Sequence, residues 1–395
     1  MSEAARSRAD VRWSFALFFC VFAAWYAVRP VRDAMGIVGS VRDLPRLFLV
    51  TLAVTLGVTP LFSAMVSRLP RSRFVAVAYR IAALSLVAFA FLLRGPSPSA
   101  EVARVFFVWS SVLNLFLITL AWALMADVFS REDGIRFFAL IGGGGTLGAI
   151  VGSGIASIFG GEANVPVSLL AGGLLLEAAV RCAHRTGATS RTAGRALPEG
   201  GVLRWMRSAM LSPYFLGICT YLVAFTFSST VLYFQQASIV KAALLGTSAR
   251  TLLFARIDLA TNLLTFVLQI SVVGRSLRFA GIGAALALLP LYTLGCFVAL
   301  HFAPLIWVLV VCQVSRRALD FAFAKPAREV LFTVVDPADK YKAKSFIDTF
   351  VYRSGDAFAA VGFAGLSIGA LATLMGAVCG LWAIVAVALG RWSMK

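Results

Sequence analysis

Two copies of one charged pentad stand in apolar parts of the chain. The first is Arg29–Asp33, with the sequence Arg-Pro-Val-Arg-Asp, and the second is Lys325–Glu329, with the sequence Lys-Pro-Ala-Arg-Glu. A charge inside a membrane segment is costly, so such a residue usually faces a water-filled path or a polar ligand. Each pentad offers two cationic groups to an anion and one carboxylate that can neutralise them when no ligand is present. We therefore interpret the pentads as two parts of one binding device for an anionic solute.

The first pentad extends a polar face of the helix that we expect to contain it. Trp25, Arg29 and Arg32 have the spacing of one helix face, and Asp33 follows Arg29 by one turn and can neutralise it. Pro30 removes a backbone donor, so a kink or an opened turn is expected there. An alternative interpretation starts an external loop at residue 29 and leaves these charges solvated.

The second pentad belongs to a longer basic face. Four residues have the spacing i, i+4, i+8 and i+11 and are therefore predicted to share one side of a helix: Arg317, Phe321, Lys325 and Arg328. In an alternative interpretation, the pairs Arg316–Asp320 and Lys325–Glu329 only neutralise each other and stabilise the helix. Even then the basic groups outnumber the carboxylates, and an anionic ligand would relieve the surplus.

Two further polar stripes follow helical spacing in apolar surroundings. The first is formed by Asp258, Asn262, Thr265 and Gln269. The second is formed by Asp348, Tyr352 and Asp356, with Lys344 and Arg353 nearby. Hydrogen bonds between helices explain either stripe as well as a binding role does. The candidate solute-binding residues are Arg29, Arg32, Asp33, Arg317, Asp320, Lys325, Arg328, Glu329, Asp258, Asn262, Lys344, Asp348 and Arg353.

The composition requires these residues to be carried by membrane helices. Hydrophobic residues make up 60% of the chain and charged residues 14%, with a mean hydropathy of +0.88. These values are typical of proteins that cross the membrane many times. Apolar runs of about 20 residues predict twelve spans, near 13–38, 46–68, 73–93, 102–128, 136–159, 165–182, 212–237, 250–274, 279–301, 304–334, 343–368 and 370–392.

The distribution of charge orients these spans. The net charge of +18 is concentrated in alternate loops, as the positive-inside rule requires, so both termini are expected to be cytoplasmic and no nucleic-acid partner is needed. The polar stretch His184–Gly201 separates six spans from six. We predict an N-terminal bundle at 1–182, a cytoplasmic loop at 183–208 and a C-terminal bundle at 209–395.

An all-α membrane protein with twelve transmembrane helices in two six-helix bundles has the layout of the major-facilitator fold. In that fold the first, fourth, seventh and tenth helices line a central cavity. Both pentads fall on such helices, the first and the tenth.

No enzyme chemistry is visible in the sequence. The six cysteines form no C-x-x-C pair and there are only two histidines, so we expect neither a metal site nor a cofactor. No nucleophile–base pair can be recognised. The run Gly142–Gly145 lacks the Lys-Ser/Thr of a phosphate loop. Gly144, Gly148 and Gly152 instead predict close packing of two helices.

From about Val11 to the C-terminus the chain resembles the ATP/ADP antiporter family of plastids and intracellular bacteria, and more closely its relatives in other bacteria, a branch of the major facilitator superfamily. The matching segments are Trp109–Gly148, Lys325–Val335, Lys340–Asp348 and Arg353–Gly355. The resemblance implies that Arg32 and Arg328 bind nucleotide phosphates. This chain departs from the family's pattern at two positions. The family's glutamate of the fourth helix aligns with the apolar residues Phe106–Val108, and its acidic residue of the seventh helix aligns near Gln235–Gln236, so both carboxylates are missing. An anionic organic phosphate is therefore the expected substrate class, rather than ATP and ADP specifically.

Together these observations predict a secondary transporter that moves a nucleotide or a related organic phosphate by alternating access. Its partners would be the lipid bilayer and a small anionic solute, and it would act as a monomer in a bacterial inner membrane. One alternative is a proton-coupled transporter of another solute, driven by titration of Asp127, Asp258 or Asp348. Another is a membrane sensor or scaffold that does not transport.

Overall fold

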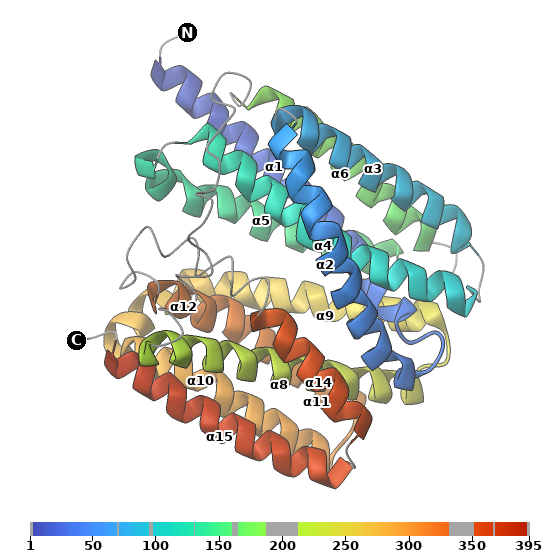
Figure 1. Cartoon of the computed structure of the whole chain (residues 1–395), viewed down its shortest axis with the longest axis vertical. Coiled ribbons are helices and arrows are strands. Elements are labelled where there is room, and N and C mark those ends of the chain that lie inside the picture. Colours follow the sequence, from blue (N-terminus) through green and yellow to red (C-terminus); the bar gives the residue numbers. More distant parts are fainter. Residues whose placement is uncertain are drawn as a thin grey trace. The chain divides into compact units, whose positions relative to one another are not determined.

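A computed structural model of the whole chain shows a helical protein (Figure 1). The structure describes residues 3–68, 71–94, 98–129, 131–159, 165–186, 212–331, 351–365 and 368–392. Within these ranges the regular secondary structure is helical throughout.

The helices of the first half of the chain are α1 (Glu3–Met35), α2 (Leu44–Arg68), α3 (Arg71–Leu92), α4 (Ala100–Val128), α5 (Arg131–Phe159) and α6 (Val165–Arg185). Those of the second half are α8 (Pro213–Ala243), α9 (Thr247–Leu268), α10 (Gly274–Phe302), α11 (Ile306–Leu319), α12 (Lys325–Leu331), α14 (Tyr352–Gly365) and α15 (Ile368–Trp392). A 3₁₀ turn covers Val41–Asp43, and π-helical turns cover Gln269–Val273 and Asp320–Ala324.

In the described part of the chain, nine helices are long and apolar enough to cross a membrane, and each overlaps one of the predicted spans. Three predicted spans remain. The span 46–68 coincides with α2, the described part of 304–334 is divided between α11, a π turn and α12, and the described part of 343–368 contains α14. The helix α1 continues through Pro30 to Met35. This course contradicts the alternative in which an external loop starts at residue 29.

The described residues fall into two compact units. Unit 1 lies within Met1–Ser40, Val50–Ala196 and Leu244–Asn262, and unit 2 within Val41–Leu49, Leu197–Ala243 and Leu263–Lys395. The predicted bundle boundaries at residues 182 and 209 stay a prediction.

In unit 1 the backbones of α1 and α5 lie in direct contact, because glycines line the face of α5. A Cβ at Gly144, Gly148 or Gly152 would overlap a backbone carbonyl of α1, at Phe15, Phe19 and Ala23 respectively. The predicted close packing of this glycine face is confirmed. It fixes α1, and with it the first pentad, against α5.

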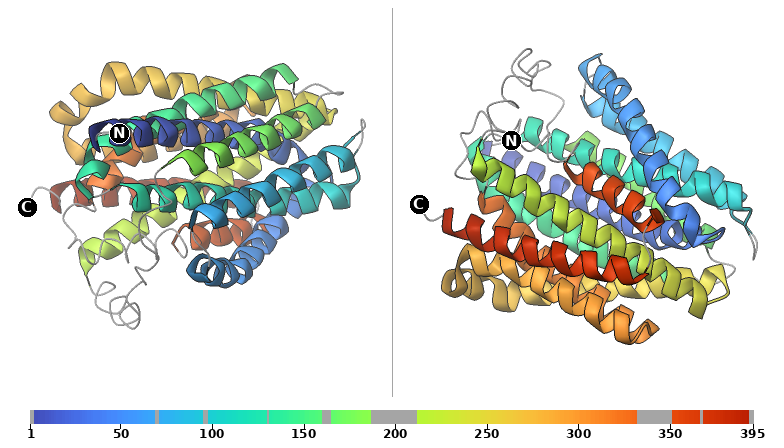
Figure 2. Two further views of the ribbon diagram at one scale, coloured as in Figure 1. Left: turned by 90° about the horizontal axis from the view of Figure 1, so that it is seen from above. Right: turned by 60° about the horizontal axis from the view of Figure 1, so that its bottom comes forward.

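In unit 2 the helices α8, α10 and α15 pack side by side (Figure 2). Trp382 of α15 and Tyr221 of α8 are fully buried between them, and the two rings meet edge to face at 5.5 Å. Gly283 of α10 meets Gly390 of α15 backbone to backbone. This apolar core supports the face of α8 that carries Phe225 and Ser229.

Candidate functional site

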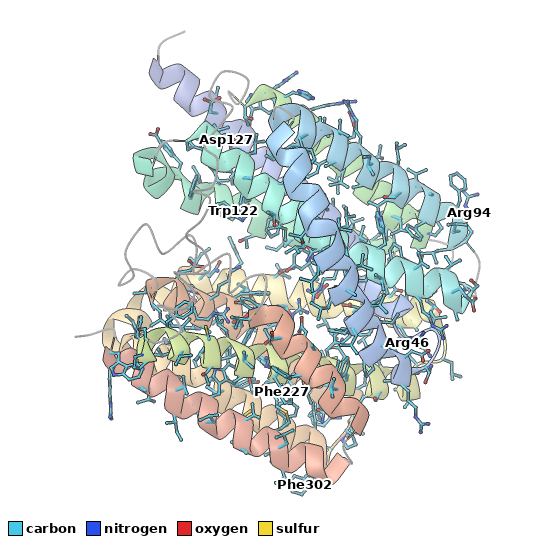
Figure 3. All side chains as sticks on the ribbon, in the orientation of Figure 1. Arg46, Arg94, Trp122, Asp127, Phe227 and Phe302 are labelled. Atoms are coloured by element: carbon cyan, nitrogen blue, oxygen red, sulfur yellow. The ribbon has the colours of Figure 1, made fainter. Side chains whose placement is uncertain are left out.

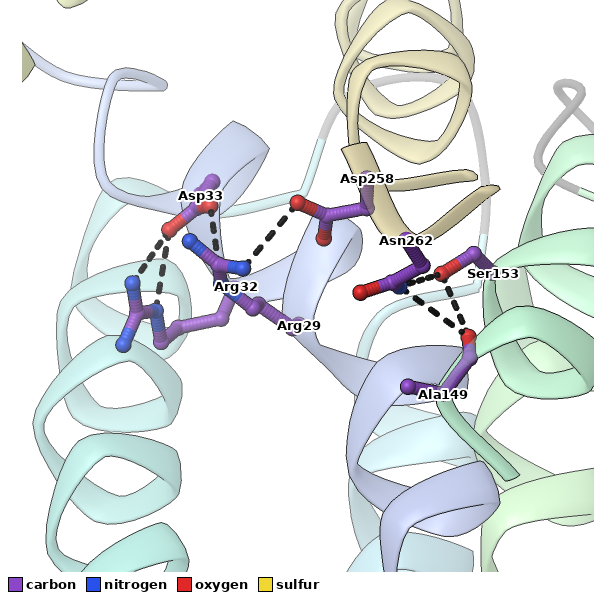
Figure 4. A network of polar contacts seen from close by, with 7 residues as sticks. All are labelled: Arg29, Arg32, Asp33, Ala149, Ser153, Asp258 and Asn262. Atoms are coloured by element: carbon purple, nitrogen blue, oxygen red, sulfur yellow. Dashed lines mark hydrogen bonds and ion pairs between the residues drawn. The ribbon is translucent and has the colours of Figure 1, made fainter. Parts of the chain in front are cut away.

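The first pentad forms a network of ion pairs inside unit 1 (Figure 4). Arg32 donates to Oδ1 of Asp33 from Nε at 3.0 Å and from Nη2 at 2.5 Å. Arg29 donates from Nη1 to Oδ1 of Asp258 on α9 at 3.0 Å, and its Nε lies 3.9 Å from Oδ2 of Asp33. Both aspartates are buried, and Asp258 is only 2% exposed. The two arginines and two aspartates of this network therefore balance each other in charge.

Aromatic rings enclose the two arginines of the pentad. The guanidinium of Arg32 lies 5.6 Å from the ring of Trp25 and 5.4 Å from the ring of Phe107 on α4. That of Arg29 lies 5.8 Å from the ring of Tyr26. Ring faces attract cations, so these contacts help to hold the guanidinium groups inside the protein. Phe107 lies in the segment where the family resemblance would place a glutamate.

The polar stripe of α9 reaches two different helices of unit 1. Asp258 binds α1, as described, and Asn262 donates from Nδ2 to Oγ of Ser153 at 3.0 Å and to the carbonyl of Ala149 at 3.3 Å, both on α5. Ser153 in turn donates to the Ala149 carbonyl at 2.7 Å (Figure 4). Thr265 continues the stripe and is buried. Gln269, which the spacing places on the same stripe, is exposed.

We expect the pair Arg29–Asp258 to contribute measurably to the stability of unit 1. Asp258→Asn and Arg29→Gln should each lower the unfolding temperature of the purified protein. The double variant should lose less than the sum, with a coupling energy of about 0.5–3 kcal/mol, because each single change already removes the ion pair. Arg256 is exposed two residues before Asp258 and provides a matched control. In the control double variant Arg256→Gln with Asp258→Asn, the losses of stability should simply add. If the losses in Arg29→Gln with Asp258→Asn also simply add, the Arg29–Asp258 pair does not have this role.

The second pentad is positioned by a π turn at Asp320–Ala324. Lys325 donates its backbone N–H to the carbonyl of Asp320, five residues back, which is the bond of a π-helix. Pro326 accounts for the widened turn, because a proline clashes with the carbonyl four residues before it, here that of Ala322. Sequence and local geometry thus agree in placing the π turn immediately before the pentad.

The π turn changes which residues share a face. In an uninterrupted α-helix, residues eight apart point about 80° from each other. Here Arg328 donates from Nη2 to Oδ1 of Asp320, eight residues earlier, at 3.0 Å, and both side chains are buried. Lys325 and Glu329 are exposed. The basic face predicted from a constant helical period is therefore divided, and Arg328 pairs with Asp320.

Arg316 joins Arg328 at one aromatic ring inside unit 2. The guanidinium of Arg328 lies 4.5 Å and that of Arg316 5.8 Å from the ring centroid of Phe225 on α8. Arg316 also donates from Nε to Oγ1 of Thr293 at 3.1 Å and from Nη2 to Oγ of Ser229 at 2.6 Å. Both buried guanidinium groups thus lie over one ring, and of the two only Arg328 bonds a carboxylate in the described contacts, that of Asp320.

This cluster carries a surplus of positive charge. Arg328 is 8% exposed, and its Nη1 atom has no hydrogen-bond partner among the residues that the structure describes. A buried donor without a partner is costly, and a charged one more so. An anion that accepts a hydrogen bond from Nη1 would satisfy this donor and balance the charge.

The structure brings some of the predicted site residues together and separates others. Five lie in the network of unit 1, namely Arg29, Arg32, Asp33, Asp258 and Asn262. In unit 2, Asp320 and Arg328 form a pair, Arg317 is half-buried on α11, and Lys325 and Glu329 are exposed on α12. Lys344 and Asp348 lie outside the described residues, and so does the side chain of Arg353, whose backbone belongs to α14. Asp356 accepts a hydrogen bond from Thr230 of α8 at 2.6 Å.

The residues that the sequence did not single out are mainly the partners of these charges: Phe107, Ser153, Phe225, Ser229 and Thr293. Arg316 was considered only as a partner of Asp320, which the structure instead pairs with Arg328. Arg316 had a signal, because it is a second arginine beside Arg317, but its face could not be predicted without the π turn. The described residues contain no group of three potential metal ligands, such as histidine, cysteine, aspartate or glutamate.

Comparison with known proteins identifies the fold. A scan against protein-family models and a search of curated proteins give no match to this chain. Among solved structures, a bacterial homologue of the human lysosomal transporter Spinster, inward-facing and unoccupied, matches with a TM-score of 0.63 and 14% identity, over 100% of this chain and 94% of that one. The nucleoside transporter NupG matches with a TM-score of 0.60 and 14% identity over 99% of each chain. An autoinhibited peptide transporter of the POT family matches with a TM-score of 0.68 and 12% identity, over 98% of this chain and 97% of that one. The chain thus has the predicted all-α membrane fold of the major-facilitator type.

Proposed function

We propose that this protein is a secondary transporter that moves a small organic anion across the membrane by alternating access, with a nucleotide or a related organic phosphate as the leading candidate. The observation that carries this proposal is the buried cluster in which Arg316 and Arg328 both lie over the ring of Phe225, while Asp320 is paired with Arg328. The fold supports transport, because the three solved structures compared above are of two transporters and a transporter homologue.

The geometry of the cluster suits a phosphate oxygen. A guanidinium offers donors in a fixed fork that matches phosphate, and charge-assisted hydrogen bonds of this kind are stronger than neutral ones. Arg328 can keep Asp320 on Nη2 while Nη1 binds the solute. Thr293 and Ser229 hold Arg316 in place, so the second positive charge stays beside the first.

The network of unit 1 would supply a second anion-binding site, whose ion pairs are exchangeable. Its arginines are already paired with Asp33 and Asp258. A phosphate that competes for Arg29 would release Asp258 and so weaken the link between α1 and α9. Solute binding would in this way be coupled to movement of α9, as alternating access requires.

We further propose that the protein resides in a bacterial inner membrane as a monomer with both termini in the cytoplasm, and that it is related to the ATP/ADP antiporters. The distribution of basic residues supports the orientation. The match of Lys325–Val335, with Arg328 among its residues, supports the relationship. Apolar residues stand at Phe106–Val108, where the family has a glutamate. This difference favours an organic phosphate other than ATP or ADP as an additional candidate substrate.

Uptake by proteoliposomes tests the proposed function. Vesicles that contain the purified protein are loaded with ADP or with another phosphorylated solute, and the uptake of labelled ATP, ADP and sugar phosphates is measured. We expect saturable uptake of at least one phosphorylated solute, faster in loaded than in empty vesicles, and absent from protein-free vesicles. If no phosphorylated solute in the panel is taken up saturably, the proposed substrate class is wrong.

Proton-coupled transport of a different solute is the second candidate, and the position of Asp258 favours it. This carboxylate is buried and joins α1 to α9 through Arg29, so its protonation would weaken the same link. Internal pH can be followed with a trapped dye while solute is added to the vesicles. Alkalinisation or acidification that depends on solute and is lost in Asp258→Asn would support this candidate.

A further inference from the structure

An ion pair between α3 and α6 of unit 1 plays no part in the proposed transport. Arg80 of α3 donates from Nε to Oε2 of Glu177 on α6 at 3.1 Å and from Nη2 to Oε1 at 3.2 Å. The two parallel bonds hold both side chains in a defined position. The Arg80 side chain is nevertheless 54% exposed.

Both residues of this pair belong to helices long and apolar enough to cross a membrane, Arg80 within Phe74–Leu92 and Glu177 within Val165–Arg185. Glu177 precedes the end of α6 at Arg185 by eight residues, about 12 Å along the helix. The guanidinium of Arg185 lies 4.7 Å from the ring of Trp13 on α1. Tryptophan is enriched at the level of the lipid headgroups, so Trp13 and Arg185 indicate that level. If Arg185 marks the headgroup level, Glu177 and its partner Arg80 are about two helical turns deeper.

The exposed side of α3 and α6 around the pair is apolar, as expected of a surface in contact with lipid. Ile81 and Leu84 of α3 and Leu174 of α6 are among the most exposed large apolar side chains of unit 1. The two helices run side by side at the edge of this unit (Figure 1). A charged pair on such a surface is costly unless a polar group covers it.

Basic residues on α6 create a surplus of positive charge beside the pair. Arg181 is 79% exposed, and its Nε lies 3.9 Å from Oε1 of Glu177. Arg185 is exposed one turn further, next to the exposed His184. Two arginines, Arg80 and Arg181, thus reach the one carboxylate of Glu177, and Arg185 adds a third positive charge nearer the headgroup level. Basic sites between transmembrane helices are typical binding sites for anionic lipid headgroups.

We propose that this face, which we call the α3–α6 basic face and define by Arg80, Glu177, Arg181 and Arg185, binds one anionic phospholipid. Its phosphate would be held by Arg181 and Arg185, with Arg80 at the deeper end, and an acyl chain would lie along Leu84, Ile81 and Leu174. Lysine and arginine side chains reach toward the headgroups from buried positions, so Arg181 can meet the phosphate from its depth. A second copy of the chain is a poorer occupant, because it would bring two positive surpluses together.

Thermal unfolding in mixed micelles tests this proposal. The purified full-length protein is kept in a neutral detergent that contains either phosphatidylglycerol, cardiolipin or phosphatidylcholine at equal phosphate concentration. We expect the two anionic lipids to raise the unfolding temperature and phosphatidylcholine to leave it unchanged, since a ligand that binds only the folded state stabilises it. The variant R181Q/R185Q should lose most of this shift, and R181K/R185K should keep most of it.

Arg94 provides the matched control, because it is exposed just beyond the C-terminal end of α3, with its guanidinium 4.1 Å from the ring of Phe91 (Figure 3). R94Q should respond to anionic lipid as the wild type does.

An equal shift of the unfolding temperature with phosphatidylcholine, or an undiminished shift in R181Q/R185Q, would overturn the proposal. A full shift with inorganic phosphate alone would assign the face to a free anion instead of a lipid. Loss of a dimer in R181Q/R185Q without any lipid effect would assign it to self-association. Uptake of solute, measured on the same variants in vesicles, tests the transport proposal separately.

Discussion

Replacing Arg328 with glutamine is expected to remove binding of the phosphorylated solute and to destabilise unit 2. The change deletes the Nη1 donor proposed to bind the solute, which should weaken binding about tenfold or more. It also leaves Asp320 buried without its cation, at a cost of about 3–5 kcal/mol. Equilibrium binding and thermal unfolding of the purified variant measure the two effects.

Two controls separate binding from stability in this prediction. The double variant Arg328→Gln with Asp320→Asn removes both charges and should regain much of the stability but none of the binding. Lys325→Gln changes an exposed cation of the same pentad and should leave both quantities near the wild-type values. Solute binding by folded Arg328→Gln with wild-type affinity would exclude Arg328 from the site.

Changing Gly148 to alanine is expected to have the largest effect on the stability of unit 1. Its new methyl group would overlap the carbonyl of Phe19, so α1 and α5 would have to move apart. Overpacking of this kind costs about 1–3 kcal/mol, and the displaced α1 carries Arg29 and Arg32. We therefore expect a lower unfolding temperature together with weaker solute binding.

Gly154, on the same helix, is the matched control for this substitution. A Cβ at Gly154 meets no atom within 4 Å. Gly154→Ala should therefore stabilise the protein by about 0.5–1 kcal/mol, because alanine loses less conformational freedom than glycine in a helix. The two substitutions are the same in chemistry and opposite in expected sign. A Gly148→Ala protein as stable as Gly154→Ala would show that the contact between α1 and α5 is not close.

The sequence predicts the membrane helices well because one physical property decides them. An apolar run long enough to cross the bilayer has few other stable forms, since its backbone must satisfy its own hydrogen bonds. The first pentad could be placed for the same reason, as α1 stays helical through Pro30. The helical spacing of Asp258 and Asn262 then indicated a shared polar face, and the structure directs both residues toward neighbouring helices.

The second pentad shows where the helical period fails. α1 continues as a helix through the proline of the first pentad, whereas a π turn at Asp320–Ala324 precedes the second pentad. That turn aligns Arg328 with Asp320 and leaves Lys325 exposed, whereas a constant period groups Arg328 with Lys325. The partners on other helices, such as Phe107 and Phe225, could not be predicted either. Contacts between helices depend on packing, which a pattern within one helix does not contain.

The most direct test of the central claim compares adenosine with its phosphorylated forms as ligands of the purified protein. The unfolding temperature of the wild type and of Arg328→Gln is measured with adenosine, AMP, ADP, ATP and several sugar phosphates, each over a range of concentrations. We predict that at least one phosphorylated solute stabilises the wild type saturably, that its unphosphorylated counterpart does not, and that Arg328→Gln loses the effect. Stabilisation by neutral or cationic solutes alone, or an equal response of Arg328→Gln, would contradict the assignment of this cluster as the anion-binding site.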